Sequence, residues 1–138
     1  MKVVIDTNVF VSAIYWPKEE RRCFALFAKR KFQLAATAEI LEEYAEVARR
    51  MHAKYAWADP EPWINWLSLK AGLCESSPLG KQRSHDSTDD IFLGCALASG
   101  AAVIVSKDKD LLGLGKPFGV EVLTPRQFLG WAKCEGWR

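Results

Sequence analysis

Four acidic residues stand at the edges of hydrophobic segments that lie far apart in the chain. They are Asp6 after the apolar run 2–5, Glu43 within an amphipathic stretch, Asp89 at the start of another, and Asp108 just after the run 103–106. Carboxylates that a fold brings together repel one another, and a hard divalent cation with oxygen ligands relieves that repulsion. Their convergence would therefore make a metal site suited to phosphate chemistry.

Segments with strand-like and helix-like hydrophobic periods alternate along the chain. Strands are expected at 2–5, 32–35, 102–106 and 119–123, and helices at 20–30, 37–50, 60–73, 88–99 and from 125 onward. A glycine that stops a helix just before a β-branched strand, as Gly100 does here, is typical of half a βαβ crossover. This alternation predicts an α/β fold with a parallel sheet that is covered by helices on both faces.

Local signals set the limits of several of these elements. Thr37 offers an N-cap to the helix at 37–50, and Thr124 with Gln127 predicts a capping box for the last helix. Residues 6–8 are expected to form a polar turn after the first strand. The helix at 60–73 is expected to turn its apolar residues to the core, namely Trp63, Trp66, Leu67 and Leu69.

The expected topology places three of the acidic residues at one rim of the sheet. Ligands of such folds lie at the carboxyl ends of the parallel strands, which Asp6 and Asp108 both follow. Asp89 opens a helix whose N-terminus faces the same rim. Its neighbour Asp90 is the alternative, but adjacent helical side chains point about 100° apart, so only one of the two aims at a given point.

Glu43 is the fourth candidate because of its place on the predicted helix at 37–50. It adjoins the apolar stripe that contains Ile40, Tyr44 and Val47, so it is expected at the edge of the buried face. The other acidic residues of this helix are expected to be solvated: Glu39, Glu42 and Glu46. This contrast predicts one partly buried carboxylate.

Each acidic residue also has a simpler structural explanation. Asp6 fits an Asx-turn or a helix cap, Asp89 fits the acid-favouring first turn of a helix, and Asp108 fits a turn. The metal site is the stronger hypothesis because all three would meet at one rim, where like charges need compensation.

The composition is that of one soluble domain spanning residues 1–138. The 138 residues are 49% hydrophobic and 26% charged, with a net charge of +2, so the charge alone identifies no nucleic-acid partner. No apolar run is long enough for a membrane span and no signal-peptide pattern is present, so a cytoplasmic protein is expected. The four cysteines form no C-x-x-C pair and are expected to be free thiols.

Four segments of the chain resemble, in order, the motifs of the PIN-domain family. They are Val3-Val4-Ile5-Asp6-Thr7-Asn8-Val9, Leu41-Glu42-Glu43-Tyr44-Ala45-Glu46-Val47, Asp86-Ser87-Thr88-Asp89-Asp90-Ile91-Phe92-Leu93, and Val103-Ile104-Val105-Ser106-Lys107-Asp108-Lys109-Asp110-Leu111-Leu112. An Asp-Thr-Asn alone is weak evidence, whereas four such segments with the expected spacing are strong. The likeness runs from the first strand to the last helix.

The resemblance implies a three-layer α/β/α sandwich with a central parallel sheet and a ribonuclease site that uses Mg²⁺ or Mn²⁺. By motif, Asp6, Glu43, Asp89 and Asp108 match the four acidic positions of the family, with Asp110 as an outer carboxylate. Thr7, Asn8 and Ser106 match its supporting polar positions, where Ser106 keeps the hydroxyl of the threonine often found there. Small members of this kind are similar to the toxins of toxin-antitoxin pairs, which are usually dimers neutralised by a small antitoxin protein.

The leading hypothesis is metal-assisted hydrolysis of an RNA phosphodiester by a divalent-metal-dependent endoribonuclease. The basic residues near the predicted site are expected to track the RNA backbone: Lys81, Arg83, Lys107 and Lys109. Neither histidine, His52 or His85, stands in a nucleophile-base pattern.

Two alternatives remain open, a non-catalytic module that binds RNA or protein, and a nuclease for RNA processing or structured DNA. An interface between two copies is expected to use Trp57, Trp63 and Trp66.

Overall fold

The computed structural model describes residues 1–75 and 90–137, and its strands form one parallel sheet. The strand order is β3-β2-β1-β4-β5, and every pairing in this sheet is parallel. The strands are β1 (Lys2–Ile5), β2 (Gln33–Ala36), β3 (Gly72–Leu73), β4 (Val103–Val105) and β5 (Glu121–Leu123). The predicted α/β fold with a central parallel sheet is confirmed.

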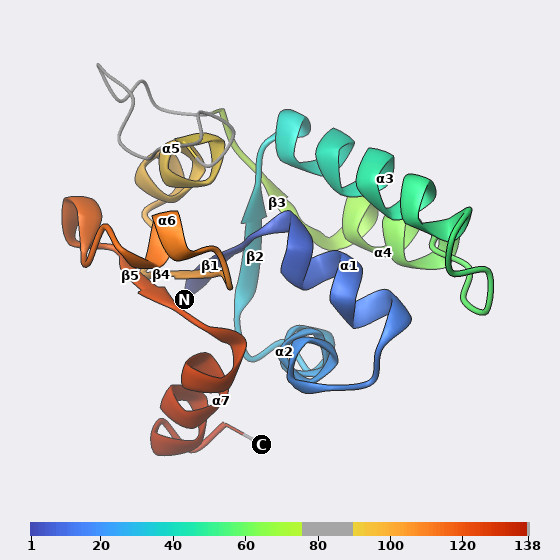
Figure 1. Ribbon diagram of the computed structural model, residues 1–138. Coiled ribbons are helices and arrows are strands. Elements are labelled where there is room, and N and C mark those ends of the chain that lie inside the picture. The colour runs from blue at the N-terminus through green and yellow to red at the C-terminus, as the bar shows by residue number, and fades with distance from the viewer. Residues whose placement is uncertain (76–89, 138) are drawn as a thin grey trace.

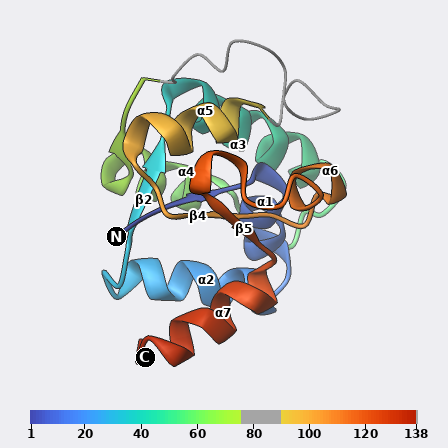
Figure 2. The same cartoon turned by 90° about the vertical axis from the view of Figure 1, so that its left-hand side faces the viewer.

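Helices cover both faces of this sheet (Figure 1). They are α1 (Thr7–Tyr15), α2 (Glu19–Ala28), α3 (Ala38–His52), α4 (Glu61–Lys70), α5 (Asp90–Ser99), α6 (Lys109–Leu112) and α7 (Pro125–Cys134). The view turned by 90° shows α2 and α7 on one side of the sheet and α5 on the other (Figure 2). The architecture is the three-layer α/β/α sandwich that the family resemblance implies. None of the described helices combines the length and apolar character that crossing a membrane requires.

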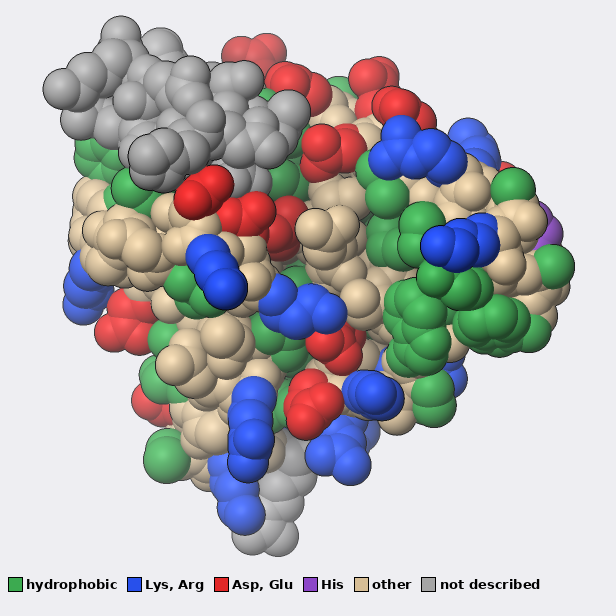
Figure 3. Space-filling view, in the orientation of Figure 1, with side chains coloured by type: hydrophobic (Ala, Val, Ile, Leu, Met, Phe, Trp, Pro, Cys, Tyr) green, Lys and Arg blue, Asp and Glu red, His purple; other side chains and the backbone are tan. Residues whose placement is uncertain are grey.

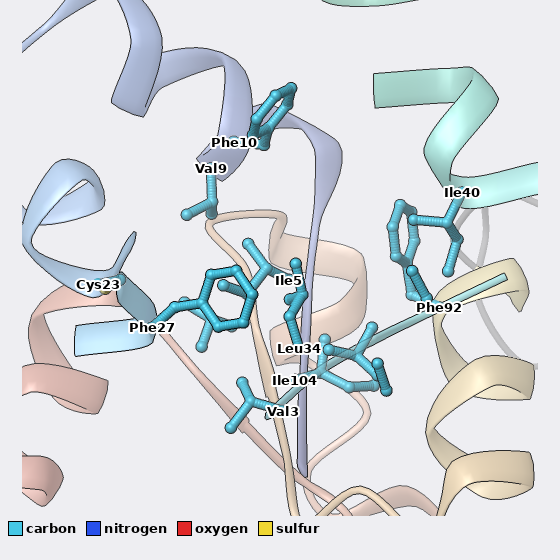
Figure 4. Packing of buried hydrophobic residues seen from close by; sticks show 14 of the residues in the cluster. Val3, Ile5, Val9, Phe10, Cys23, Phe27, Leu34, Ile40, Phe92 and Ile104 are labelled. Atoms are coloured by element: carbon cyan, nitrogen blue, oxygen red, sulfur yellow. The ribbon is translucent and has the colours of Figure 1, made fainter. Parts of the chain in front are cut away.

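The central strands are buried on both faces, as parallel strands between two helical layers must be. The residues of β1 from Val3 to Ile5 are fully buried, and so is Ile104 of β4. Figure 4 shows Phe27 of α2 packing from one side of these strands, and Ile40 of α3 with Phe92 of α5 from the other. The strands are therefore held in fixed positions, and so is the backbone of the residues that directly follow them.

The predicted helix caps are confirmed. The Thr37 hydroxyl accepts a hydrogen bond from the Ile40 amide at 3.1 Å, and α3 begins there. Thr124 and Gln127 form the complete capping box at the start of α7. Gly100 ends α5 with φ of 72°, a left-handed backbone that glycine adopts without a Cβ penalty.

Two predicted elements are wrong. Residues 7–15 form helix α1 instead of leading through a polar turn, since Asp6 alone makes the transition from β1. The helix predicted to end at 73 ends at Lys70, and residues 72–73 become the edge strand β3, which pairs with Ala35 and Ala36 of β2.

The predicted buried face of α4 is corrected at one position. Leu69 is 81% exposed, whereas Leu67 is buried as expected and Ile64 is buried as well. Trp63 and Trp66 are partly buried and lie against Phe24, with ring centroids 6.2 and 6.3 Å from it. The four cysteines are free, and Cys95 is buried in α5.

Candidate active site

The neighbouring strands β1 and β4 form the point where the strand order reverses. The chain continues from β1 to β2 on one side, and from β4 to β5 on the other. Open α/β sheets bind ligands in the crevice beyond the carboxyl ends of the strands at such a switch point. Ile5 pairs with Val105, so Asp6 and Ser106 lie side by side just past the two strand ends.

Asp6 is fixed at this position by contacts with the β4 segment. It is only 5% exposed, and its amide donates to the Val105 carbonyl at 2.9 Å. Its carboxylate makes no capping hydrogen bond to α1, although Asp6 is the N-cap residue of that helix. Instead the carboxylate accepts a hydrogen bond from the Ser106 hydroxyl at 2.7 Å. The helix-cap explanation of Asp6 therefore does not account for its side chain.

Ser106 connects Asp6 to Asp108. Its hydroxyl donates to Asp6 and also accepts a hydrogen bond from the Asp108 amide at 2.9 Å, and the residue is fully buried. One carboxylate oxygen of Asp108 accepts from the Asp110 amide at 2.7 Å and caps α6. The turn-forming role of Asp108 therefore holds for one of its two oxygens. Asp110 takes part in this network through its backbone amide.

Glu43 reaches the same region from helix α3. The Thr7 hydroxyl donates a hydrogen bond to the Glu43 carboxylate, and the Tyr44 hydroxyl donates to the carbonyl of Ile5 at the end of β1. Glu43 is half-buried. The remaining glutamates of α3 are exposed, namely Glu39, Glu42 and Glu46, so the predicted contrast on this helix is confirmed.

The electrostatics of the region are those of crowded carboxylates. Burial raises the pKa of the Asp6 carboxyl, and the negative charges of Asp108 and Glu43 raise it further. The hydrogen bond from Ser106 and the nearby amide of Thr7 act in the opposite direction without cancelling the rise. Burial also raises the pKa of the Tyr44 hydroxyl, to which the charge of Asp6 contributes. The ionised form of Asp6 is therefore less favourable here than in water, and a bound cation would offset that cost.

The donors in this region are of the type that Mg²⁺ and Mn²⁺ prefer, namely carboxylate oxygens. One oxygen each of Glu43 and Asp108 is held by a hydrogen bond, and the other has no hydrogen-bond partner within the described residues. Among those residues, however, no group of three or more His, Cys, Asp or Glu side chains is arranged to hold a metal ion. The donor type thus fits the ion, and residues 1–75 and 90–137 do not by themselves complete its ligand set.

Three predicted site residues lie outside the described residues, namely Asp89, Lys81 and Arg83. Asn8 is exposed on the first turn of α1, and its amide has no partner in the part of the chain that the structure describes. Asp90, the alternative to Asp89, is the first residue of α5 and is partly exposed.

Lys107 and Lys109 differ in their surroundings. Both are exposed, but the Lys107 ammonium forms an ion pair with Glu20 at 2.9 Å and donates to the Ser12 hydroxyl at 3.2 Å. Burial would raise the pKa of the Glu20 carboxyl, but the hydrogen bond and charge of Lys107 hold that pKa below its ordinary value. Sequence reasoning missed Glu20, because two glutamates at the start of a helix are also what the helix dipole favours.

The surface of this region combines charge with an apolar patch. In the space-filling view, acidic side chains gather over α6 and α3, and hydrophobic side chains lie beside them over the ends of α1 and α3 (Figure 3). This apolar patch adjoins the acidic region rather than lying on a separate face.

Comparison with known families identifies the family of this chain. The family model described as the PIN domain matches residues 2–110, which includes β1, α3, β4 and the start of α6. A comparison with curated proteins gave no match. The matched range covers most of the 138 residues and contains every acidic residue considered above. The chain therefore belongs to the PIN-domain family.

Proposed function

We propose that this protein is a divalent-metal-dependent endoribonuclease that hydrolyses RNA phosphodiester bonds. PIN domains are generally nucleases that act on nucleic acid and typically use divalent metal ions, which supports the class of activity. The observation that carries the proposal is the link from Asp6 through the Ser106 hydroxyl to the Asp108 amide, at the point where the strand order reverses. This link holds Asp6 and Asp108 close together at the switch point, where open α/β sheets bind their ligands.

The proposed ligands of the ion are Asp6, Glu43, Asp89 and Asp108, with Asp110 as an outer carboxylate. Mg²⁺ or Mn²⁺, when bound, lowers the pKa of a water molecule and neutralises charge on the phosphoryl oxygens. In the reaction, water adds to phosphorus, the bond to the leaving ribose oxygen breaks, and one phosphate end and one hydroxyl end result.

The supporting residues act by orientation. Ser106 fixes one oxygen of Asp6 by its hydrogen bond, and Thr7 does the same for Glu43. Such contacts hold carboxylates in a single orientation, which is how outer hydrogen bonds tune a metal site. Asn8 and Lys109, both exposed, are available to the RNA from this rim.

We further propose that the protein is the toxin of a toxin-antitoxin pair, and that it works as a homodimer neutralised by a small antitoxin protein. This role is supported by the family resemblance. Expression of the native protein, but not of Asp6→Asn, should arrest growth, and a neighbouring small gene should relieve the arrest. Growth unaffected by the native protein would count against the toxin role alone.

Cleavage of a mixed RNA pool tests the enzymatic proposal. The native protein should cleave RNA with Mg²⁺ or Mn²⁺ and lose this activity with a chelator. Glu43→Gln removes a proposed ligand at nearly constant volume, so activity should fall by more than the roughly 10- to 100-fold typical of losing an outer-shell partner. Glu46→Gln is the matched control, because it makes the same change at an exposed position of the same helix.

Asp6→Asn should behave like Glu43→Gln. Equal activity of the native protein and both site variants would refute the assignment of these residues. Cleavage of a DNA pool at the same rate would show that the nuclease does not select RNA.

A further inference from the structure

A groove of about 470 Å³ leads away from the acidic region between α1 and α3. Asn8 and Ser12, four residues apart on one face of α1, line it together with Trp16, the residue that follows the helix. Val47 and Met51 line it from α3, and they continue the helix face that carries Glu43. Asp108 also lines it, so the groove is continuous with the proposed metal site.

The two helices run alongside each other for the whole length of this groove. Thr7 contacts Glu43 near one end, and the Tyr15 hydroxyl donates to the Ala48 carbonyl at 2.8 Å near the other. From Asn8 to Tyr15 the helical rise amounts to about 10 Å, and Trp16 follows at the end of the helix. The groove thus extends from the site of chemistry to an aromatic side chain at a fixed distance.

The walls of the groove combine an aromatic surface with hydrogen-bonding groups. Trp16 is partly exposed and is held by an edge contact with Tyr55, whose ring centroid is 5.2 Å away. The Asn8 amide both donates and accepts and has no partner within the described residues. The Ser12 hydroxyl accepts from Lys107 and keeps its own proton to donate. A flat apolar surface with nearby donors and acceptors is what a nucleobase requires.

The charge of the groove favours a base over a phosphate. Among the described residues, Lys107 is the one cation that lines the groove, and its ammonium forms an ion pair with Glu20 at 2.9 Å. An apolar helix of a partner protein would cover Val47 and Met51, but it would leave the Asn8 amide and the Ser12 proton without partners, which costs free energy. A neutral ring with polar edges satisfies both kinds of wall.

We propose that this groove is a nucleobase subsite, in which Trp16 stacks on a base of the RNA next to the phosphate that water attacks at the proposed metal site. The inference rests on the proposed function and gives it a determinant of substrate binding. The subsite makes affinity depend on a base at one position of the RNA, whereas backbone contacts do not.

The test measures binding of two oligomers to protein made inactive by Asp6→Asn. One is a short fluorescein-labelled single-stranded RNA, and the other is the same ribose-phosphate chain without bases. Trp16→Ala should weaken RNA binding by about fivefold to about a hundredfold, the range expected for one stacked base. Affinity for the abasic chain should stay unchanged, and Trp16→Phe should retain most of the affinity for RNA.

Trp131→Ala is the matched control, because Trp131 is also partly buried among aromatic rings but lies on α7. Val47→Phe fills the groove without removing Trp16, and it decides the question if Trp16→Ala fails to fold in a thermal melt. It should produce the same base-dependent loss.

Equal losses for both oligomers, or unchanged binding of both by Val47→Phe, would overturn the subsite. Unchanged binding would leave the groove to an apolar segment of a partner protein. Cleavage of RNA by the native protein is measured in parallel, so failure of the subsite is distinguishable from failure of the nuclease proposal.

Discussion

The junctions β1–α1 and β5–α7 are built alike, yet the side chains of their N-cap residues make different hydrogen bonds. In each, one residue separates a parallel strand from a helix, Asp6 in the first and Thr124 in the second. Thr124 caps its own helix by accepting from the Gln127 amide at 3.1 Å. Asp6 leaves its helix uncapped and accepts from Ser106, which is 100 residues away in sequence. Asp6 thus makes no local capping bond and instead lies near the negative charges of Asp108 and Glu43. A side chain placed in this way is a candidate for function.

The largest effect on this comparison is expected from Ser106→Ala. The substitution removes the hydroxyl shared by the Asp6 carboxylate and the Asp108 amide, and it leaves a buried charged oxygen without its donor. Unfolding free energy should fall by about 3 kcal/mol, and RNA cleavage should fall by roughly 10- to 100-fold. Urea unfolding and cleavage assays measure the two effects. Ser99→Ala on α5 is the control, because its hydroxyl makes only a long bond of 3.4 Å within its own helix.

If Ser106→Ala retains full stability, the hydrogen bond from Ser106 to Asp6 does not stabilise the fold. The β1–α1 and β5–α7 junctions would then differ less in energy than their hydrogen bonds indicate.

The β4–α6 junction sharpens the comparison through Lys107. Glu20→Gln should lower stability by about 1 kcal/mol, because the partly exposed Lys107 loses its ion pair while a hydrogen bond remains possible. The pKa of Glu20 is lowered in the folded protein, so the contribution of this pair is present above the ordinary glutamate pKa and is lost as pH falls through the lowered value.

Melting temperatures of the native protein and Glu20→Gln should therefore converge in acid. A constant difference across the acid range would contradict the assignment. Glu19→Gln, at the adjacent and more exposed position, should have little effect at any pH.

The junction with a conventional cap should respond only in stability. Thr124→Ala removes the hydroxyl that accepts from the Gln127 amide, so unfolding free energy should fall by about 1 kcal/mol. RNA cleavage measured well below the melting temperature should not change, since Thr124 follows the edge strand β5 and its hydroxyl accepts from the Gln127 amide of its own helix. Loss of cleavage by a folded Thr124→Ala protein would show that the two junctions are not separate in function.

Sequence periodicity was sufficient for the elements whose signals are local. The caps at Thr37 and Thr124 and the buried strand β1 have this character, and each is confirmed. The placement of Asp6 beside the β4 end followed from strand polarity alone, which is a property of parallel sheets. The exposure of the glutamates around Glu43 followed from helical geometry.

Other features depend on long-range contacts that no local pattern encodes. The edge strand β3 forms because Gly72 and Leu73 meet β2, although the residues before them are helical. Helix α1 has an aspartate at its N-cap, but no side-chain capping bond forms and the first turn has no acidic residue, so its start signal is weak. The hydrogen bond from Ser106 fixes one oxygen of the Asp6 carboxylate, and neither oxygen caps α1.

The smallest predicted effect is that of Asp6→Asn, which should raise stability, whereas the substitutions above lower it. The pKa of Asp6 is raised in the folded protein, so its stabilising contribution is present below the ordinary aspartate pKa and is lost as pH rises through the raised value. At neutral pH the charge therefore costs stability, and Asp6→Asn should melt at a slightly higher temperature than the native protein in a chelating buffer. Glu46→Gln, at an exposed position, should melt at the same temperature as the native protein.

Added Mn²⁺ should raise the melting temperature of the native protein more than that of Asp6→Asn, because only a folded protein with its full set of carboxylates gains from binding the ion. An Asp6→Asn protein that melts lower than the native one would mean that Asp6 stabilises the fold as Thr124 does, and the difference between the two junctions would then lie in their geometry and not in their function.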